Sequence, residues 1–126
     1  MFRKSRIATA AATLAVSLCA LTGIADAAGS SSQVSILGNN GDYYGYVHSS
    51  DATHCENNRK VTVFKQLGAT QDQHVDQKIG TDIAQPNGPD AMWSIGNSGF
   101  KSGSFYAKAA KVPGYCKAAT SPTITR

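Results

Sequence analysis

Short runs of alternating apolar and polar residues follow one another along the chain from residue 34 onward. In the run 43–49, Gly45 and Val47 fall on one side of an extended chain, and Tyr44, Tyr46 and His48 fall on the other. An alternation with a period of two residues is typical of a strand that buries one side and exposes the other. The pattern therefore predicts β-strands with a buried face and a solvent face.

Glycine, proline and asparagine separate these runs. Turn residues stand at Asn39-Asn40-Gly41-Asp42 and at Asn87-Gly88. Between most of the breakers there is no room for a helix of ~11 residues. The predicted strands lie at 34–37, 43–49, 60–63, 77–84, 91–95, 103–109, 115–118 and 120–125. About seven or eight short strands with regular turn signals predict a single all-β domain over residues 34–126, folded as an antiparallel β-sandwich.

The apolar side of each predicted strand supplies a small core. Its members are expected to be Val47, Val61, Val63, Ile79, Ile83, Trp93, Ile95, Phe105, Ala107 and Tyr115. A core of this size suits one two-sheet domain and no larger architecture.

Residues 1–27 are predicted to be a secretory signal peptide. Three basic residues lie within the first six positions, an apolar stretch runs from residue 7 to 24, and Ala25-Asp26-Ala27 has the small-x-small form of a cleavage site. The alternative of a membrane anchor is disfavoured, because a spanning helix needs ~20 strongly apolar residues and this stretch is diluted by Thr and Ser. The order of these features resembles a bacterial export signal. We expect cleavage after Ala27, a flexible lead-in over residues 28–33, and a secreted protein, extracellular or periplasmic, without a membrane anchor.

Charge adds little to this picture. The chain has 12 Lys+Arg against 8 Asp+Glu, a formal net charge of +4, but three of the basic residues and one acid lie in the predicted leader. The remaining balance favours solubility and gives no reason to expect a nucleic-acid or membrane partner. We expect a monomer.

Two cysteines remain once Cys19 is removed with the leader. An even number in an exported chain favours a disulfide, here between Cys55 and Cys116. His54, together with His48 and His74, raises the alternative of a metal site. Neither Cys-x-x-Cys nor His-x-x-x-His spacing occurs, so we expect no metal and no cofactor.

A set of short motifs between Gly45 and Ser121 resembles a known family. The motifs are Gly45-x-Val47-x-Ser49, Cys55-x-x-x-Arg59-x-Val61-x-Val63-Phe64, Ile79-Gly80-Thr81-Asp82, Asn87-Gly88, Trp93-x-Ile95, Gly103-x-Phe105-Tyr106-Ala107 and Tyr115-Cys116-x-Ala118. In this order they resemble the transthyretin-like, carboxypeptidase-regulatory-like β-sandwich modules of exported bacterial proteins. The resemblance implies an immunoglobulin-like sandwich with no catalytic residues of its own.

No catalytic constellation assembles from the sequence. A Gly-x-Ser-x-Gly elbow is missing, and the acidic residues beyond the leader fall mostly in predicted loops, where solvated turn residues are the simpler interpretation. These acids are Asp42, Asp51, Glu56, Asp72, Asp76, Asp82 and Asp90. We expect no enzyme and no catalytic residues.

Three tyrosines in four positions form the candidate binding surface: Tyr43, Tyr44 and Tyr46. Exposed tyrosines stack on sugar rings or anchor a protein partner. The alternative is that they pack, since aromatic residues favour strands for packing reasons alone. The leading hypothesis is a secreted, non-enzymatic binding or structural module whose partner is an extracellular protein or glycan. The alternatives are a carbohydrate-binding module that uses the tyrosines, and a small secreted enzyme or toxin.

Overall fold

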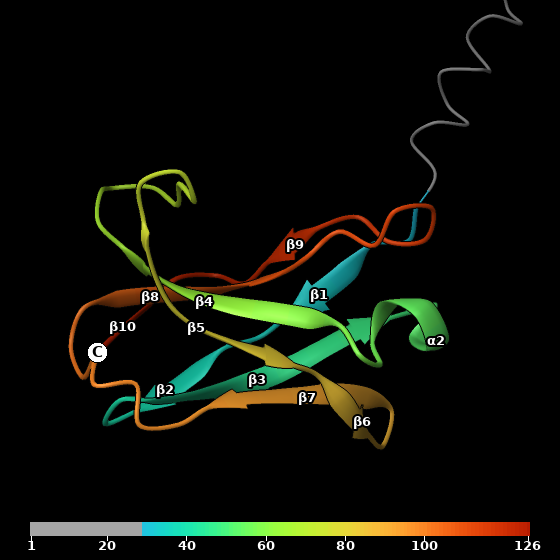
Figure 1. The fold of residues 1–126 in the computed structure, drawn as a ribbon, viewed down its shortest axis with the longest axis horizontal. Coiled ribbons are helices and arrows are strands. Elements are labelled where there is room, and N and C mark those ends of the chain that lie inside the picture. The colour runs from blue at the N-terminus through green and yellow to red at the C-terminus, as the bar shows by residue number, and fades with distance from the viewer. Residues whose placement is uncertain (1–28) are drawn as a thin grey trace, which may run out of the picture.

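A computed structural model describes residues 29–126; the predicted signal peptide lies outside them. The described residues form ten strands arranged in two five-stranded sheets, and neighbouring strands within each sheet run antiparallel. The sheets lie face to face with the core between them (Figure 1). The predicted all-β antiparallel sandwich is confirmed.

The first sheet, called here the β3 sheet, is built around the long strand β3 (Asp42–Ser49). On one side of β3 lie the short strands β1 (Ser32–Val34) and β2 (Leu37–Asn39), and on the other lies β7 (Asp90–Ile95). The strand β6 (Gln85–Asn87) pairs with β7 and ends the sheet.

The second sheet, called here the β4 sheet, has β4 (Lys60–Gln66) at its centre. Its neighbours are β5 (Gln77–Ile83), which is an edge strand, and β8 (Ser104–Ala109). Two very short strands, β9 (Ala119–Thr120) and β10 (Ile124–Thr125), pair with β8.

Residues with special backbone requirements stand where the chain turns or crosses closely. Asn40 and Gly41 have φ of 54° and 92° and close the β2–β3 hairpin, as the Asn-Gly pair predicted. Gly45 lies where residue 35 passes close by, and a Cβ at Gly45 would lie 2.0 Å from the carbonyl oxygen of Ser35. A side chain at this position would force the edge of the sheet apart.

The core follows the predicted alternation. Val47, Val61, Val63, Trp93, Phe105 and Ala107 are all buried between the sheets. The ring of Tyr43, from the β3 sheet, packs against the ring of Phe105, from the β4 sheet, with 4.6 Å between their centroids. Burial of these side chains removes apolar surface from water, which is the main favourable contribution to folding.

Two expected core residues are exposed instead. Ile83 is the last residue of the edge strand β5, where no further strand covers it. Tyr115 lies in a turn, because the amides of Tyr115 and Cys116 bond back to the carbonyl of Val112. The strand predicted over 115–118 is therefore wrong, and Ile79 and Ile95 are only partly buried.

The described part of the predicted lead-in is paired. The amide of Ser30 donates to the carbonyl of Tyr115 (2.8 Å), its carbonyl accepts from Lys117 (3.0 Å), and β1 begins at Ser32. The small polar residues of this segment are held through the main chain, which composition does not reveal.

A four-residue helix, α2 (Ala52–Cys55), follows β3 and was not predicted. The side chain of Asp51 caps it by accepting from the amide of His54 (3.2 Å). A single turn is too short to show helical periodicity in the sequence.

The outer face of the β4 sheet carries two aromatic rings that a loop covers. Phe64 and Tyr106 pair across β4 and β8 with ring centroids 5.4 Å apart, and both are buried. Asp76 fastens the loop 67–76: it accepts hydrogen bonds from the Tyr106 hydroxyl (2.6 Å), the Asp72 amide (2.7 Å) and the Leu67 amide (2.9 Å). The expectation that Asp76 is a solvated turn residue is wrong.

Candidate functional site

The outer face of the β3 sheet carries the exposed tyrosines. Tyr44 and Tyr46 are 36% and 38% exposed, and both point away from the core because they alternate with buried Gly45 and Val47. Their cross-strand neighbours are Leu37 and Ser94 beside Tyr44, and Met92 beside Tyr46. We use the name tyrosine face for Gln33, Leu37, Tyr44, Tyr46, His48, Asp90, Met92 and Ser94.

Tyr43 does not belong to the tyrosine face. Its side chain is 1% exposed, its ring contacts Phe105, and its hydroxyl donates a 2.6 Å hydrogen bond to the carbonyl of Phe100. Burial raises the pKa of Tyr43, against a smaller opposing effect of Arg126. Of the three candidate tyrosines, Tyr43 is therefore a core residue, and Tyr44 and Tyr46 share the outer face.

An open groove of about 740 Å³ runs along one side of the tyrosine face. It extends from Tyr46 and His48 across residues 33–36 to Pro122 and Ile124 beside the opposite sheet. Its polar lining residues are Gln33, Ser35, His48 and Asp90, and its apolar ones are Val34, Ile36, Tyr46, Pro89, Pro122 and Ile124. A half-exposed ring beside several hydrogen-bonding side chains suits a ligand with both apolar and hydroxyl faces.

His48 stands at one end of this groove between two carboxylates. Its Nδ1 lies 2.6 Å from Oδ1 of Asp90 and 3.4 Å from Oε2 of Glu56. Glu56 is 2% exposed, and its Oε2 also accepts a 2.7 Å hydrogen bond from the amide of Ser49. The three side chains come from β3, from the end of α2 and from the start of β7.

Sequence reasoning missed this cluster. His48 and Asp90 are 42 positions apart, and Glu56 was expected in a solvated loop, whereas the end of α2 turns it inward against Ser49. The only signal in the sequence was the alternation that places His48 on the outer side of its strand.

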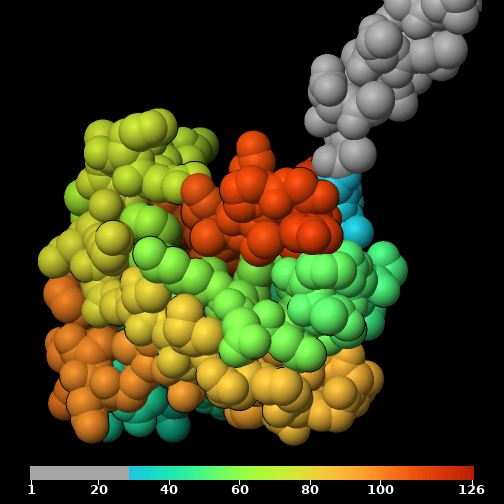
Figure 2. Space-filling model, turned by 45° about the vertical axis from the view of Figure 1, so that its right-hand side comes forward, coloured from blue at the N-terminus to red at the C-terminus, as the bar shows by residue number. Residues whose placement is uncertain are grey.

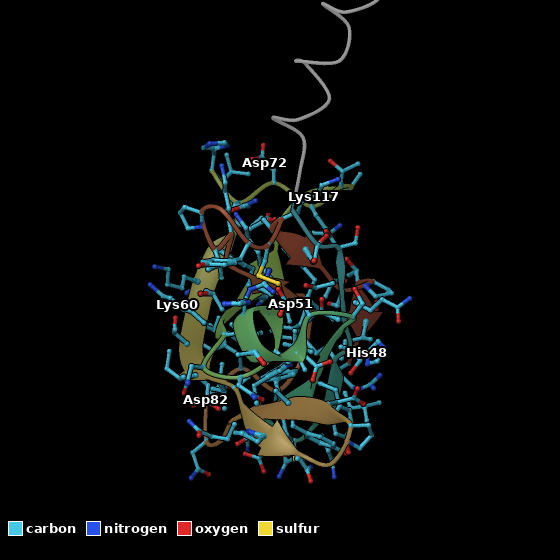
Figure 3. All side chains as sticks on the ribbon, turned by 90° about the vertical axis from the view of Figure 1, so that its right-hand side faces the viewer. His48, Asp51, Lys60, Asp72, Asp82 and Lys117 are labelled. Carbon is cyan, nitrogen blue, oxygen red and sulfur yellow. A yellow bond between two sulfur atoms is a disulfide. The ribbon has the colours of Figure 1, made fainter. Side chains whose placement is uncertain are left out.

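The predicted disulfide joins Cys55 and Cys116, whose Cα atoms lie 5.7 Å apart. Figure 3 shows it beside α2 at one end of the sandwich. Tyr115 stacks on His54 there, with 3.9 Å between ring centroids and 6° between ring planes. In the space-filling view the green segment around α2 lies directly against the orange-red residues that follow β8 (Figure 2). The disulfide thus ties an extension of the β3 sheet to an extension of the β4 sheet.

Arg59 is buried at the same end of the molecule and links four segments of the chain through hydrogen bonds. It is buried, and its guanidinium donates to the carbonyls of Ala110, Cys55 and Lys117 and to the hydroxyl of Ser32 over 2.6–2.9 Å. Burial lowers the pKa of Arg59. Since its donors are occupied by main-chain and hydroxyl oxygens of four segments, Arg59 has a structural role.

The three histidines do not converge. Each lies beside an aspartate: His48 with Asp90, His54 with Asp51 at 3.0 Å, and His74 with Asp72 at 3.3 Å. In the described part of the chain, only the group of His48, Glu56 and Asp90 gathers three side chains of the metal-ligating types.

No family model matches the chain, and comparison with curated proteins and with solved structures gives no significant match. The class that the structure defines is a disulfide-linked antiparallel β-sandwich.

Proposed function

We propose that the protein is a secreted, non-enzymatic binding module that takes a carbohydrate on its tyrosine face. The observation that carries the proposal is the outward placement of Tyr44 and Tyr46 on one strand, with Tyr46 forming part of an open groove. Two half-exposed rings on one rigid strand offer apolar area to a ligand without a large cost in conformational entropy.

The lining chemistry of the groove favours a sugar over a purely apolar ligand. Gln33, His48 and Asp90 place an amide, an imidazole and a carboxylate in the same groove as the ring of Tyr46. A sugar ring has one face of C–H groups that stacks on an aromatic ring and a rim of hydroxyls that exchange hydrogen bonds with such polar groups. The alternative partner is an extracellular protein, for which the same rings would serve as anchors.

Export is part of this proposal. The disulfide between Cys55 and Cys116 supports an oxidising compartment. Within residues 29–126, no helix has the length and apolar character needed to cross a membrane. The likeness to transthyretin-like, carboxypeptidase-regulatory-like modules supports a role in binding without catalysis.

Retention on insoluble polysaccharides tests the proposal. The protein is incubated with chitin, cellulose and peptidoglycan, and the variants Tyr46→Ala and Tyr44→Ala are compared with the control Tyr115→Ala. Tyr115 is the matched control, because it is an exposed tyrosine at the disulfide end, outside the tyrosine face. We expect binding to at least one polysaccharide that is lost with Tyr46→Ala and kept with Tyr115→Ala. A carbohydrate ligand on this face is contradicted if Tyr46→Ala and Tyr115→Ala lose binding equally. It is also contradicted if the protein binds none of the three polysaccharides.

A further inference from the structure

We propose that His48, Glu56 and Asp90 form a binding site for a single Zn²⁺ ion at one end of the groove. One nitrogen and two oxygen ligand atoms of these side chains lie within 4.8 Å of one another. An imidazole with two carboxylates is a ligand set that zinc accepts, and three protein ligands leave a fourth position for water or an added ligand.

The buried carboxylate is the main argument for a cation. The side chain of Glu56 is only 3% exposed. A second carboxylate, that of Asp90, contacts the same nitrogen of the His48 imidazole. Taking a charge out of water is costly unless an opposite charge accompanies it. Two negative charges face one imidazole here, so even a protonated His48 compensates only one of them, whereas a divalent cation compensates both.

Two of the three distances between ligand atoms can be compared directly with those of a tetrahedral zinc site, and the third, between the Glu56 and Asp90 oxygens, is at most 4.8 Å. At Zn–N and Zn–O bond lengths of about 2.0–2.2 Å, ligand atoms of a tetrahedral site lie about 3.3–3.5 Å apart. The separation of 3.4 Å between His48 Nδ1 and Glu56 Oε2 already has this value. Oδ1 of Asp90, at 2.6 Å from the same nitrogen, must move away by about 0.7 Å. Asp90 follows the turn at Gly88 and Pro89 and its side chain is partly exposed, so this movement meets little resistance.

Zinc replaces a proton at Nδ1 of His48. A carboxylate only accepts, so the short contact between Asp90 and Nδ1 places a proton on Nδ1. Binding of the ion to Nδ1 requires that proton to leave: it moves to Nε2 in the neutral ring, or to solvent from the imidazolium form. Zinc affinity should therefore fall as the pH is lowered.

The other two histidines provide matched controls within the same chain. His54 and His74 each lie close to an aspartate, but neither has a second, buried carboxylate. His74 is 96% exposed and pairs with Asp72 alone. Adventitious zinc binding to a surface histidine would affect all three positions alike, whereas the proposed site depends on His48 only.

Isothermal titration calorimetry of the tag-free protein with zinc chloride at pH 7 tests the proposal. We expect one ion per chain, with an affinity that falls at least 10–100-fold in His48→Ala and in Asp90→Asn, since the loss of an outer-shell partner alone costs about that much. His54→Ala and His74→Ala should bind as the unaltered protein does. Calcium chloride should give no saturable binding, because Ca²⁺ prefers oxygen ligands throughout.

A second variant separates ligation from folding. Glu56→Gln keeps the size of the side chain and its acceptor for the Ser49 amide but removes the charge, so it should fold and fail to bind zinc. If Glu56→Gln does not fold, Asp90→Asn, on the partly exposed side of the cluster, decides the question. Absence of saturable zinc binding up to about 100 μM overturns the proposal. An affinity unchanged in His48→Ala, or lowered equally in His74→Ala, also overturns it.

Discussion

Each sheet carries a pair of aromatic residues on its outer face, but one pair is buried and the other is exposed. On the β4 sheet, Phe64 and Tyr106 are buried under the loop 67–76, which Asp76 fastens in place. On the β3 sheet, Tyr44 and Tyr46 are exposed, and Tyr46 lines an open groove.

Position on a strand therefore does not by itself assign a role to an aromatic residue. All four rings lie on the solvent side of a strand in the alternating pattern. The loop 67–76 packs over Phe64 and Tyr106, which form a second small core. No loop covers Tyr44 and Tyr46 in the described residues, so their rings are available to a partner. The loop 67–76 stands out above the end of β4 in Figure 1.

Removal of the covered ring should have the largest effect on stability. Tyr106→Ala leaves a cavity under the loop, so we expect the free energy of unfolding to fall by about 3–5 kcal/mol. Urea denaturation measures it. Tyr106→Phe, which keeps the ring and loses only the hydrogen bond to Asp76, should cost about 1–3 kcal/mol. A loss below about 1 kcal/mol for Tyr106→Ala would show that the loop does not depend on the ring.

Removal of the disulfide should lower the stability of both sheets together. Cys55→Ala combined with Cys116→Ala should reduce the free energy of unfolding by roughly 2–5 kcal/mol, because the cross-link limits the unfolded chain. Thermal unfolding with and without reductant provides the measurement. A midpoint that reduction leaves unchanged would refute a stabilising role for this bond.

Acid should lower the stability of the contact between the loop 67–76 and Tyr106, because that contact depends on the Asp76 carboxylate. Burial raises the pKa of Asp76, but the hydrogen bonds from Tyr106, Leu67 and Asp72 lower it more, so the net pKa lies below its ordinary value of 3.8. The contribution of Asp76 to stability is then fully present above the pKa of the unfolded state and is lost as the pH falls through the native pKa. Unfolding measured from pH 6 down to pH 2 should show this loss. The loss should be reduced in Asp76→Asn, and an equal pH dependence in this variant would contradict the assignment.

The open face should tolerate truncation. Tyr44→Ser and Tyr46→Ser, each made singly, should change the free energy of unfolding by less than about 1 kcal/mol, as expected for half-exposed cross-strand pairs. Urea denaturation beside Tyr106→Ala gives the contrast directly. A loss of several kcal/mol in either variant would mean that the exposed rings are packing residues, and would remove the distinction between the two faces.

The sequence predicted what depends on local alternation and failed where distant segments meet. The two-residue period placed Tyr44, Tyr46 and His48 outside and Val47 inside, and Asn40-Gly41 gave the hairpin. Tyr106 was on the outer side of its strand by the same rule, yet a loop distant in sequence buries it.

The candidate site was predicted only in part, for the same reason. The contact between His48 and Asp90 depends on the register of β3 against β7, which no local pattern reports. The burial of Glu56 depends on a one-turn helix that sequence periodicity cannot detect. Tyr43 adjoins the exposed tyrosines in the sequence, but the alternation of β3 places it with Gly45 on the inner side.

A map of where a sugar contacts the protein tests most directly whether the tyrosine face binds carbohydrate. Amide chemical shifts of ¹⁵N-labelled protein are followed during titration with chitohexaose, cellohexaose and soluble peptidoglycan fragments. We expect at least one of them to shift the amide signals of Tyr44, Tyr46, His48 and Met92 and to leave those of Phe64 and Tyr106 unchanged. Shifts confined to α2 and Tyr115, or an absence of shifts with every sugar, would contradict the claim that the tyrosine face is a carbohydrate-binding surface.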